Sequence, residues 1–289
     1  MEILELAKEE LPEQLLEIPE PPERLWMQGA WPAAGTKTLA VVGSRAASRY
    51  GKEATAALIG GLAGYPVSIV SGLALGIDAA AHEAALAAGL HTIAIPGSGL
   101  GESVLYPRAN RALAARILAE GGALLSEHEP EHKAAPWDFP SRNRIMVGLA
   151  DAVLVIEAAE RSGTLITARL ASEYNRDLLA IPHRIGDPHG FGAHLFLRLG
   201  AALVTEPLHI LEVLKIAPRE DTCATPGVAH IPADLSSTEH ALYVALSEPR
   251  SRDELIRASH LSAGEALTAL VSLELRGLIK EQYGAWRRM

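Results

Sequence analysis

Four short segments rich in glycine and serine each follow an apolar, β-rich run of the sequence. Glycine lets backbone N–H groups approach a ligand closely, and a helix that begins at such a loop adds positive potential. Arg45 follows Gly43-Ser44 directly and adds a charged, bidentate donor. Tight turns alone would explain Gly51 and Gly76. The other residues predict an anion-binding row, and its candidates are Gly43, Ser44, Arg45, Ser48, Ser71, Gly72, Gly97, Ser98, Gly99, Ser162, Gly163 and Thr164.

A second cluster gathers cationic, amide and aromatic side chains within residues 133–144. A positive groove with an aromatic stacking platform is what single-stranded nucleic acid requires. The alternative is that Phe139 fills the core and that the arginines pair with carboxylates. Trp137 is expected in the core. The residues predicted to bind the ligand are Lys133, Phe139, Arg142, Asn143 and Arg144, together with Arg108 and Asn110 before a neighbouring helix.

Familiar nucleotide-binding and catalytic motifs are missing from the sequence. No G-x-G-x-x-G motif follows the first strand, and Gly51-Lys52 continues with Glu53 rather than Ser or Thr. His128 and His132 have no third ligand at metal-binding spacing. No serine or cysteine nucleophile has an evident set of partners. We therefore expect a protein that is not an enzyme and that holds neither metal nor cofactor.

The net charge of −9 is unevenly distributed. Residues 1–36 contain eight acidic and two basic side chains, whereas residues 37–206 contain 16 acidic and 15 basic ones. A local basic groove in the central part is compatible with these totals. Twenty arginines against six lysines suit bidentate phosphate contacts, although a compositional bias explains the ratio equally well.

The sequence also indicates the cellular compartment in which the protein is expected to act. No apolar run reaches the roughly 18 residues that span a bilayer, and no basic segment precedes an apolar stretch at the N-terminus. The single cysteine, Cys223, excludes an intramolecular disulfide. We expect a cytoplasmic protein without a membrane partner.

The elements that must position these residues alternate between short apolar runs and longer helical patterns such as Ile77–Ala88. Such alternation predicts an α/β fold, a Rossmann-like, doubly wound and mostly parallel sheet covered on both faces. Ligands of such sheets bind at the carboxyl ends of the strands, where the glycine-rich segments lie. The predicted strands are Leu39–Val42, Val67–Val70, Thr92–Ile95, Ala123–Leu125, Ala152–Ile156, Leu178–Ile181 and Ala202–Val204.

The flanking segments differ from this central part. Residues 1–36 hold one weak helical pattern followed by prolines, and they predict an N-terminal arm. Residues 37–215 form the Rossmann-like domain, and residues 216–235, with three prolines, predict a linker. Residues 236–289 contain three helical patterns and a short hairpin closed near Gly284, which is typical of a small winged-helix domain.

Taken together, these motifs resemble the DprA/Smf family of bacterial DNA-processing proteins. The resemblance covers about residues 37–206, and the C-terminal tail is similar to that of many members, whereas the N-terminal region looks shortened. The stretches that carry it are Val41–Arg45, Tyr50-Gly51, Ser71–Asp78 with His82, Gly97–Leu100, Tyr106-Pro107 with Asn110, Phe139–Ile145, Glu157-Ala158 and Ser162–Ala168.

The resemblance implies an extended Rossmann fold that binds and protects single-stranded DNA without strong sequence preference. It implies loading of RecA recombinase during natural transformation, and a homodimer formed through the Rossmann-like domain. By motif, Gly43, Ser44 and Arg45 would hold phosphates, and the loops after the second and third strands would add N–H donors. Lys133, Arg142 and Arg144 would line the groove around a stacking platform at Phe139.

Two other functions remain open. Nucleotide phosphoribohydrolases of the lysine-decarboxylase-like group share this fold, and their signature resembles P-G-G-x-G-T-x-x-E. Here Gly163-Thr164 is followed by Leu165, Ile166 and Thr167, so a threonine stands at the place of the glutamate, which disfavours hydrolysis. A transcriptional regulator would need a basic recognition helix, but Ala263–Arg276 carries Glu265, Glu274 and a single basic residue. We expect that domain to contact protein or to make a secondary duplex contact.

Overall fold

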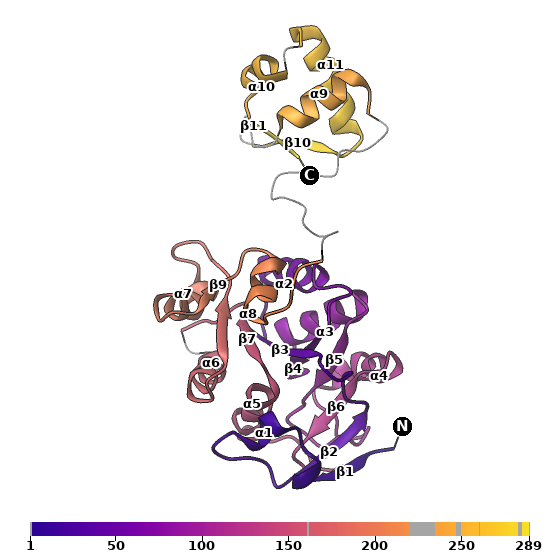
Figure 1. The fold of residues 1–289 in the computed structure, drawn as a ribbon, viewed down its shortest axis with the longest axis vertical. Helices are drawn as coiled ribbons and strands as arrows, with labels where there is room; N and C mark the ends of the chain where they lie inside the picture. Colours follow the sequence, from indigo (N-terminus) through magenta and orange to yellow (C-terminus); the bar gives the residue numbers. More distant parts are fainter. Residues whose placement is uncertain are drawn as a thin grey trace. The chain divides into compact units, whose positions relative to one another are not determined.

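A computed structural model describes residues 2–160, 162–219, 235–246, 250–259, 261–282 and 285–288. The chain divides into two compact units, Met1–Ala217 and Pro218–Met289 (Figure 1). The division falls within the segment that the sequence predicts as a linker. Most of that segment, residues 220–234, lies outside the described residues.

The first unit is built on a nine-stranded sheet with the order β1-β2-β6-β5-β4-β3-β7-β8-β9. The β1/β2 and β2/β6 pairs are antiparallel and all the others are parallel, which confirms the predicted fold class. All seven predicted strands form. The strands are β1 (Leu4–Ala7), β2 (Arg24–Gly29), β3 (Lys37–Val42), β4 (Val67–Ser71), β5 (His91–Ala94), β6 (Ala123–Ser126), β7 (Ala152–Val155), β8 (Asp177–Ala180) and β9 (Ala202–Leu203).

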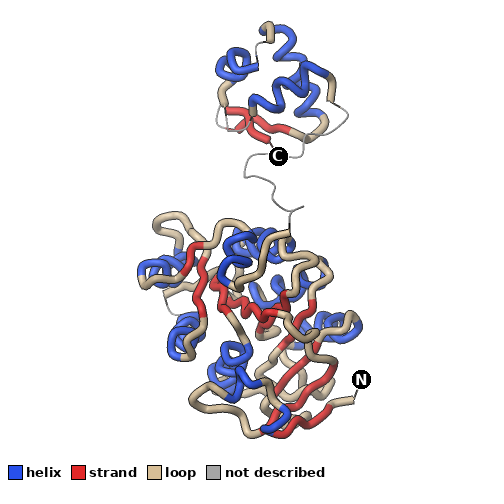
Figure 2. The backbone as a smooth tube through the Cα atoms, viewed as in Figure 1, coloured by secondary structure: helices blue, strands red, loops and turns tan. Residues whose placement is uncertain are grey.

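Helices cover both faces of the sheet (Figure 2). Successive residues of β3 show this: Ala40 and Val42 pack with the helices of one face, while Leu39 and Val41 pack with those of the other. Because side chains alternate along a strand, a strand that is apolar at every position needs cover on both sides. One face carries α1 (Glu13–Leu16), α5 (Asp138–Leu149), α6 (Thr164–Glu173) and α7 (Phe191–Arg198). The other carries α2 (Arg49–Gly60), α3 (Ile77–Ala87), α4 (Arg111–Ala119) and α8 (Pro207–Val213).

The N-terminal region differs from the predicted arm. Strand β2 pairs with β6 from Trp26↔Ser126 to Gly29↔Ala123, and β1 pairs with β2 at the edge of the sheet. Leu25 and Met27 are buried in the core. Proline-rich residues separate this strand from the preceding helix, but its apolar side chains still gain from burial against the sheet. Residues 1–36 are therefore part of the Rossmann-like unit.

The strand order contains one reversal. From β3 the chain moves outward through β4, β5 and β6, and it then crosses back to β7 on the other side of β3. The helices that follow the neighbouring strands β3 and β7 therefore leave towards opposite faces, α2 towards one and α6 towards the other. Such a switch point leaves a crevice at the carboxyl ends of the two strands.

The second unit has its own core. Helices α9 (Ser237–Ala245), α10 (Arg252–Ser259) and α11 (Ala263–Leu275) pack around Leu242, Leu270 and Trp286. Strands β10 (Ile279–Gln282) and β11 (Ala285–Arg288) pair antiparallel. This arrangement confirms the predicted winged helix, although Gly284 lies outside the described residues. In the described part of the chain, no helix is both long enough and apolar enough to cross a membrane.

Candidate nucleic-acid interface

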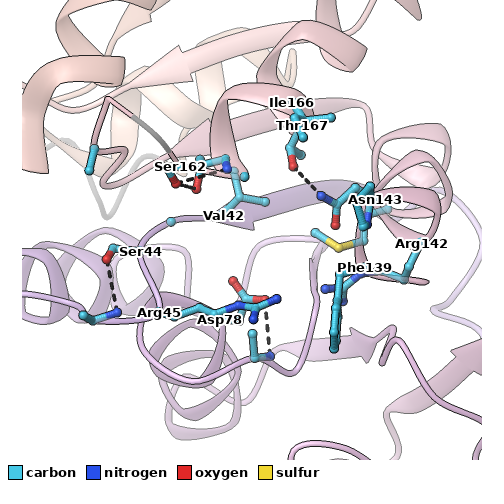
Figure 3. A pocket seen from close by; sticks show the side chains of 18 of the residues that line it. Val42, Ser44, Arg45, Asp78, Phe139, Arg142, Asn143, Ser162, Ile166 and Thr167 are labelled. Carbon is cyan, nitrogen blue, oxygen red and sulfur yellow. Dashed lines mark hydrogen bonds between the residues drawn. The ribbon is translucent and has the colours of Figure 1, made fainter. Parts of the chain in front are cut away.

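A pocket of about 700 Å³ lies at the switch point between β3 and β7 (Figure 3). The loop after β3 forms one wall, α5 forms another, and the N-terminus of α6 forms the third. Helix α6 places the positive end of its dipole at the pocket. The nine predicted site residues that this pocket brings together are Gly43, Ser44, Arg45, Phe139, Arg142, Asn143, Ser162, Gly163 and Thr164.

Arg45 and Phe139 meet at this pocket. The guanidinium carbon of Arg45 lies 4.7 Å from the centroid of the Phe139 ring, and Arg45 is exposed (Figure 3). Arg45 forms no ion pair with any other described residue. The ring of Tyr106 lies 5.7 Å from that of Phe139. The pocket therefore combines a solvent-facing cation with an aromatic platform.

Arg142 lines the same pocket but is engaged by the protein. Its side chain is buried, donates to the carbonyl oxygen of Ile95, and lies near the carboxylate of Asp78. Burial lowers the pKa of Arg142 to about 10, while Asp78 acts in the opposite direction. Burial raises the pKa of Asp78, although Arg142 and the N–H groups of Gly72 and Ala74 favour the charged form. Arg142 and Asp78 are therefore two buried, oppositely charged residues in the lining of the pocket.

Arg144 does not line the groove, which corrects the expectation from the resemblance. It donates to the carboxylate of Glu127 and to the carbonyl oxygen of Glu20. The alternative that an arginine pairs with a carboxylate therefore applies to Arg144. Lys133 and Arg108 are exposed but lie outside the residues that line the pocket.

The buried amide of Asn110 is also engaged. Its side chain donates to the carbonyl oxygens of Leu73, at 2.7 Å, and Ala74, at 3.1 Å. These bonds hold the loop after β4 and leave Asn110 outside the pocket lining.

The loop after β5 is covered. Gly97, Ser98 and Gly99 are buried, and the N–H of Gly99 donates to the carbonyl oxygen of His132 at 2.9 Å. A Cβ atom on Gly97 would lie 2.7 Å from the ring of Phe139. The glycines are thus required by close packing, and the expectation that Gly99 offers its N–H to a ligand is corrected.

The loop after β4 is occupied in a similar way. The hydroxyl of Ser71 donates to the carbonyl oxygen of Val41 at 2.7 Å, and the N–H of Gly72 donates to Asp78 at 3.1 Å. A side chain at Gly72 would collide with the guanidinium of Arg142. These two residues therefore support the pocket from below rather than offer donors to it.

Ser48 has a structural role. Its hydroxyl accepts from the N–H of Gly51 at 3.0 Å and so caps α2, and it also donates to the buried carboxylate of Glu157. The carboxylate of Glu157 accepts from the backbone N–H of Ser48 as well, at 3.1 Å. These bonds tie the start of α2 to the end of β7.

The sequence interpretation missed several residues that line the pocket. Trp137, by contrast, was expected in the core but is 74% exposed just before α5, and it does not line the pocket. Thr167 lines the pocket and accepts from the amide of Asn143 at 3.0 Å. Asp78 could have been found from its place in the first turn of a helix after Gly76. The other lining residues that were not predicted are Val42, Ala46, Ala74, Pro136, Pro140, Met146, Ala159 and Ile166.

The winged-helix unit presents a mostly apolar third helix. Leu267, Val271 and Leu275 are exposed at a spacing of four residues along α11. The guanidinium of Arg276 lies 3.7 Å from the carboxylate of Glu239. Among the described residues, α11 has no basic face of the kind that duplex-reading helices usually show.

A doubly wound α/β unit with a cation–aromatic pocket at its switch point, followed in the chain by a winged helix, is an architecture suited to binding nucleic acid. The family model for DNA recombination-mediator protein A matches residues 2–215, and that for the DprA winged helix domain matches residues 228–285. The chain therefore belongs to the DprA/Smf family of DNA-processing proteins.

Individual relatives agree with this assignment. Protein Smf of Escherichia coli is 38% identical over 294 residues, covering 96% of this chain and 75% of the relative. The X-ray structure of DprA from Streptococcus pneumoniae superposes with a TM-score of 0.69 at 40% identity, covering 75% of each chain. The Helicobacter pylori protein, whose structure was described for its single-stranded DNA binding mode, gives 0.65 at 30% identity, covering 73% of this chain and 95% of that one.

Proposed function

We propose that this protein binds single-stranded DNA, without strong sequence preference, in the pocket between β3 and β7. The observation that carries the proposal is the exposed guanidinium of Arg45 over the ring of Phe139, at the N-terminus of α6. A phosphate can bind Arg45 and the start of α6 while a base stacks on Phe139. The solved Helicobacter pylori relative, described as a single-stranded DNA binder, supports this ligand.

The contact residues that we propose are fewer than those expected from the sequence. Gly43, Ser44 and Arg45 after β3, with Gly163 and Thr164 at α6, would hold phosphates. Arg142 would act mainly by positioning the loop after β4. Lys133 and Arg108, both exposed, would make peripheral contacts with a strand that extends beyond the pocket.

We propose binding rather than catalysis. A phosphoribohydrolase needs a carboxylate near the start of α6, but Thr167 occupies that position and accepts from Asn143 at 3.0 Å. Asp78 is the single carboxylate among the described lining residues, and it is held by two N–H donors and by Arg142. Release of a free base from nucleoside monophosphates would contradict this proposal.

The test is a titration of labelled oligo-dT at several salt concentrations, read by fluorescence anisotropy. Arg45→Ala should weaken binding by roughly tenfold or more at low salt, because a charge-assisted phosphate contact is lost. The slope of log affinity against log salt should fall by about 0.7, the share of one phosphate in a single strand. Arg116→Ala, which removes an exposed arginine of α4 that does not line the pocket, is the matched control. Equal binding by Arg45→Ala and the wild type would contradict the site.

We further propose the roles that the family resemblance implies. The protein would act in the cytoplasm, protect incoming single strands and load RecA recombinase onto them during natural transformation. A homodimer would form through the Rossmann-like domain, where α7 exposes Phe191, Leu195 and the adjoining Leu199. Sedimentation equilibrium of the wild type beside Leu199→Glu tests the dimer, and RecA filament formation on coated strands tests the loading step.

A further inference from the structure

Three side chains with metal-binding atoms converge beside α5. His128 and His132 come from the connection between β6 and α5, and Asp138 is the first residue of the helix. Their ligand atoms all lie within 4.8 Å of one another. The sequence showed the two histidines without a third ligand, and the fold supplies it.

The distances in this cluster suit a small divalent ion. Nε2 of His132 lies 2.8 Å from Oδ2 of Asp138, and Nε2 of His128 lies 3.7 Å from Oδ1. A tetrahedral ion with bonds of about 2.1 Å holds its ligand atoms about 3.4 Å apart. The two observed distances, each to a different oxygen of Asp138, bracket that value, and rotation of the stacked rings would direct both nitrogens at one ion.

A simple histidine–aspartate pair does not account for the whole arrangement. The bond between His132 and Oδ2 would satisfy one ring, but the ring of His128 is stacked on it at 4.2 Å and faces the other oxygen. Each imidazole thus approaches its own oxygen of one carboxylate. The two rings thus place a nitrogen atom each beside the same carboxylate, within 4.8 Å of one another.

We propose that His128, His132 and Asp138 bind one divalent transition-metal ion, for which zinc is the best match. Two imidazole nitrogens and a carboxylate oxygen are ligands that zinc accepts, and they leave a fourth position for water. The side chain of Asp138 is buried while both rings are partly exposed, so the ion enters from solvent.

The ligands are already oriented by neighbouring groups. Oδ2 of Asp138 accepts from the backbone N–H of Ala135 at 2.7 Å, and the backbone N–H of His128 donates to the hydroxyl of Ser126 at 3.0 Å, which fixes the main chain at His128. Hydrogen bonds of this kind hold metal ligands in place and strengthen binding. The ion would link the segment that covers Gly99 to α5, one residue before Phe139, and would stabilise that wall of the pocket.

The test is zinc titration of chelator-treated full-length protein by calorimetry, with cobalt absorption as a report on geometry. The wild type should bind one zinc per chain, show the visible bands of tetrahedral cobalt, and melt at a higher temperature with zinc. His128→Ala should weaken zinc binding at least roughly tenfold. This variant leaves both hydrogen bonds to Asp138 in place, so the fold should survive.

His209→Ala is the matched control, because Nε2 of His209 lies 3.3 Å from Glu206 in a pair that lacks a third ligand. It should bind zinc like the wild type. Asp138→Asn, which preserves the shape of the side chain, is a second variant and should lose the cobalt bands. Absence of saturable zinc binding by the wild type, or unchanged affinity in His128→Ala, would overturn the proposal.

Discussion

The loops after β3 and β5 have similar compositions, but the first lines the pocket and the second is buried. Gly43-Ser44 with Arg45 opens onto the pocket, whereas Gly97-Ser98-Gly99 is buried beneath the segment that follows β6. Strand β3 lies at the switch point, where the flanking connections leave in opposite directions. Strand β5 lies between β4 and β6, and the connection from β6 folds over it. The same residue types thus form a binding surface in one place and a packed support in the other.

The largest expected effect is a difference in the free energy of unfolding between a variant of the buried Arg142 and a variant of the exposed Arg45. Arg142→Met should lower the free energy of unfolding by about 3–5 kcal/mol, because it leaves the buried Asp78 without its counter-charge. Arg45→Ala, on the open side, should change it by less than about 0.5 kcal/mol. Urea denaturation of both variants measures the difference. The double variant Asp78→Asn, Arg142→Met should recover part of the loss, and equal losses for Arg45 and Arg142 would remove the distinction.

The next effect concerns the pH dependence of stability that the buried imidazole of His82 causes. His82 on α3 is fully buried against Thr92 of β5, and burial lowers its pKa from 6.5 to about 3, with a smaller contribution from Arg142. Between these two values the unfolded chain binds more protons than the folded one, so stability falls as pH falls below 6.5. From pH 7.5 to pH 5 the wild type should lose about 2 kcal/mol more than His82→Asn. A parallel decline of the two proteins in urea titrations would show that His82 does not cause the acid sensitivity.

The smallest expected effect is a difference in stability between alanine variants of two glycines. One glycine lies in the buried loop after β5, and the other lies in a loop that lines the pocket. Gly97→Ala should cost about 1 kcal/mol, because the new Cβ would lie 2.7 Å from the ring of Phe139. Gly163→Ala should be close to neutral, since a Cβ there meets no atom within 4 Å. Thermal denaturation compares the two variants directly. A loss at Gly163 as large as that at Gly97 would show that the pocket loop is as tightly packed as the covered one.

Local patterns were sufficient to predict most of the fold. The seven strands from β3 to β9 are short apolar runs flanked by helical patterns, and both signals come from neighbours along the chain. Strands β1 and β2 were missed, because β2 depends on pairing with β6, almost one hundred residues further on, and β1 depends on pairing with β2. Trp137 was misassigned for a related reason: a large aromatic residue favours burial on average, but here the start of α5 leaves it in solvent.

The sequence by itself determined the α/β class, the winged-helix tail and the residue types of an anion site. These properties follow from periodicity and from the chemistry of single side chains. The tertiary structure decided which candidates share one pocket, since the strand order places the loop after β3 beside α6 and buries the loop after β5. It also decided the partners of Arg142 and Arg144, because those contacts join residues from distant segments. The anion-binding loops were predicted from their glycines and serines, but only the topology shows which of them a ligand can reach.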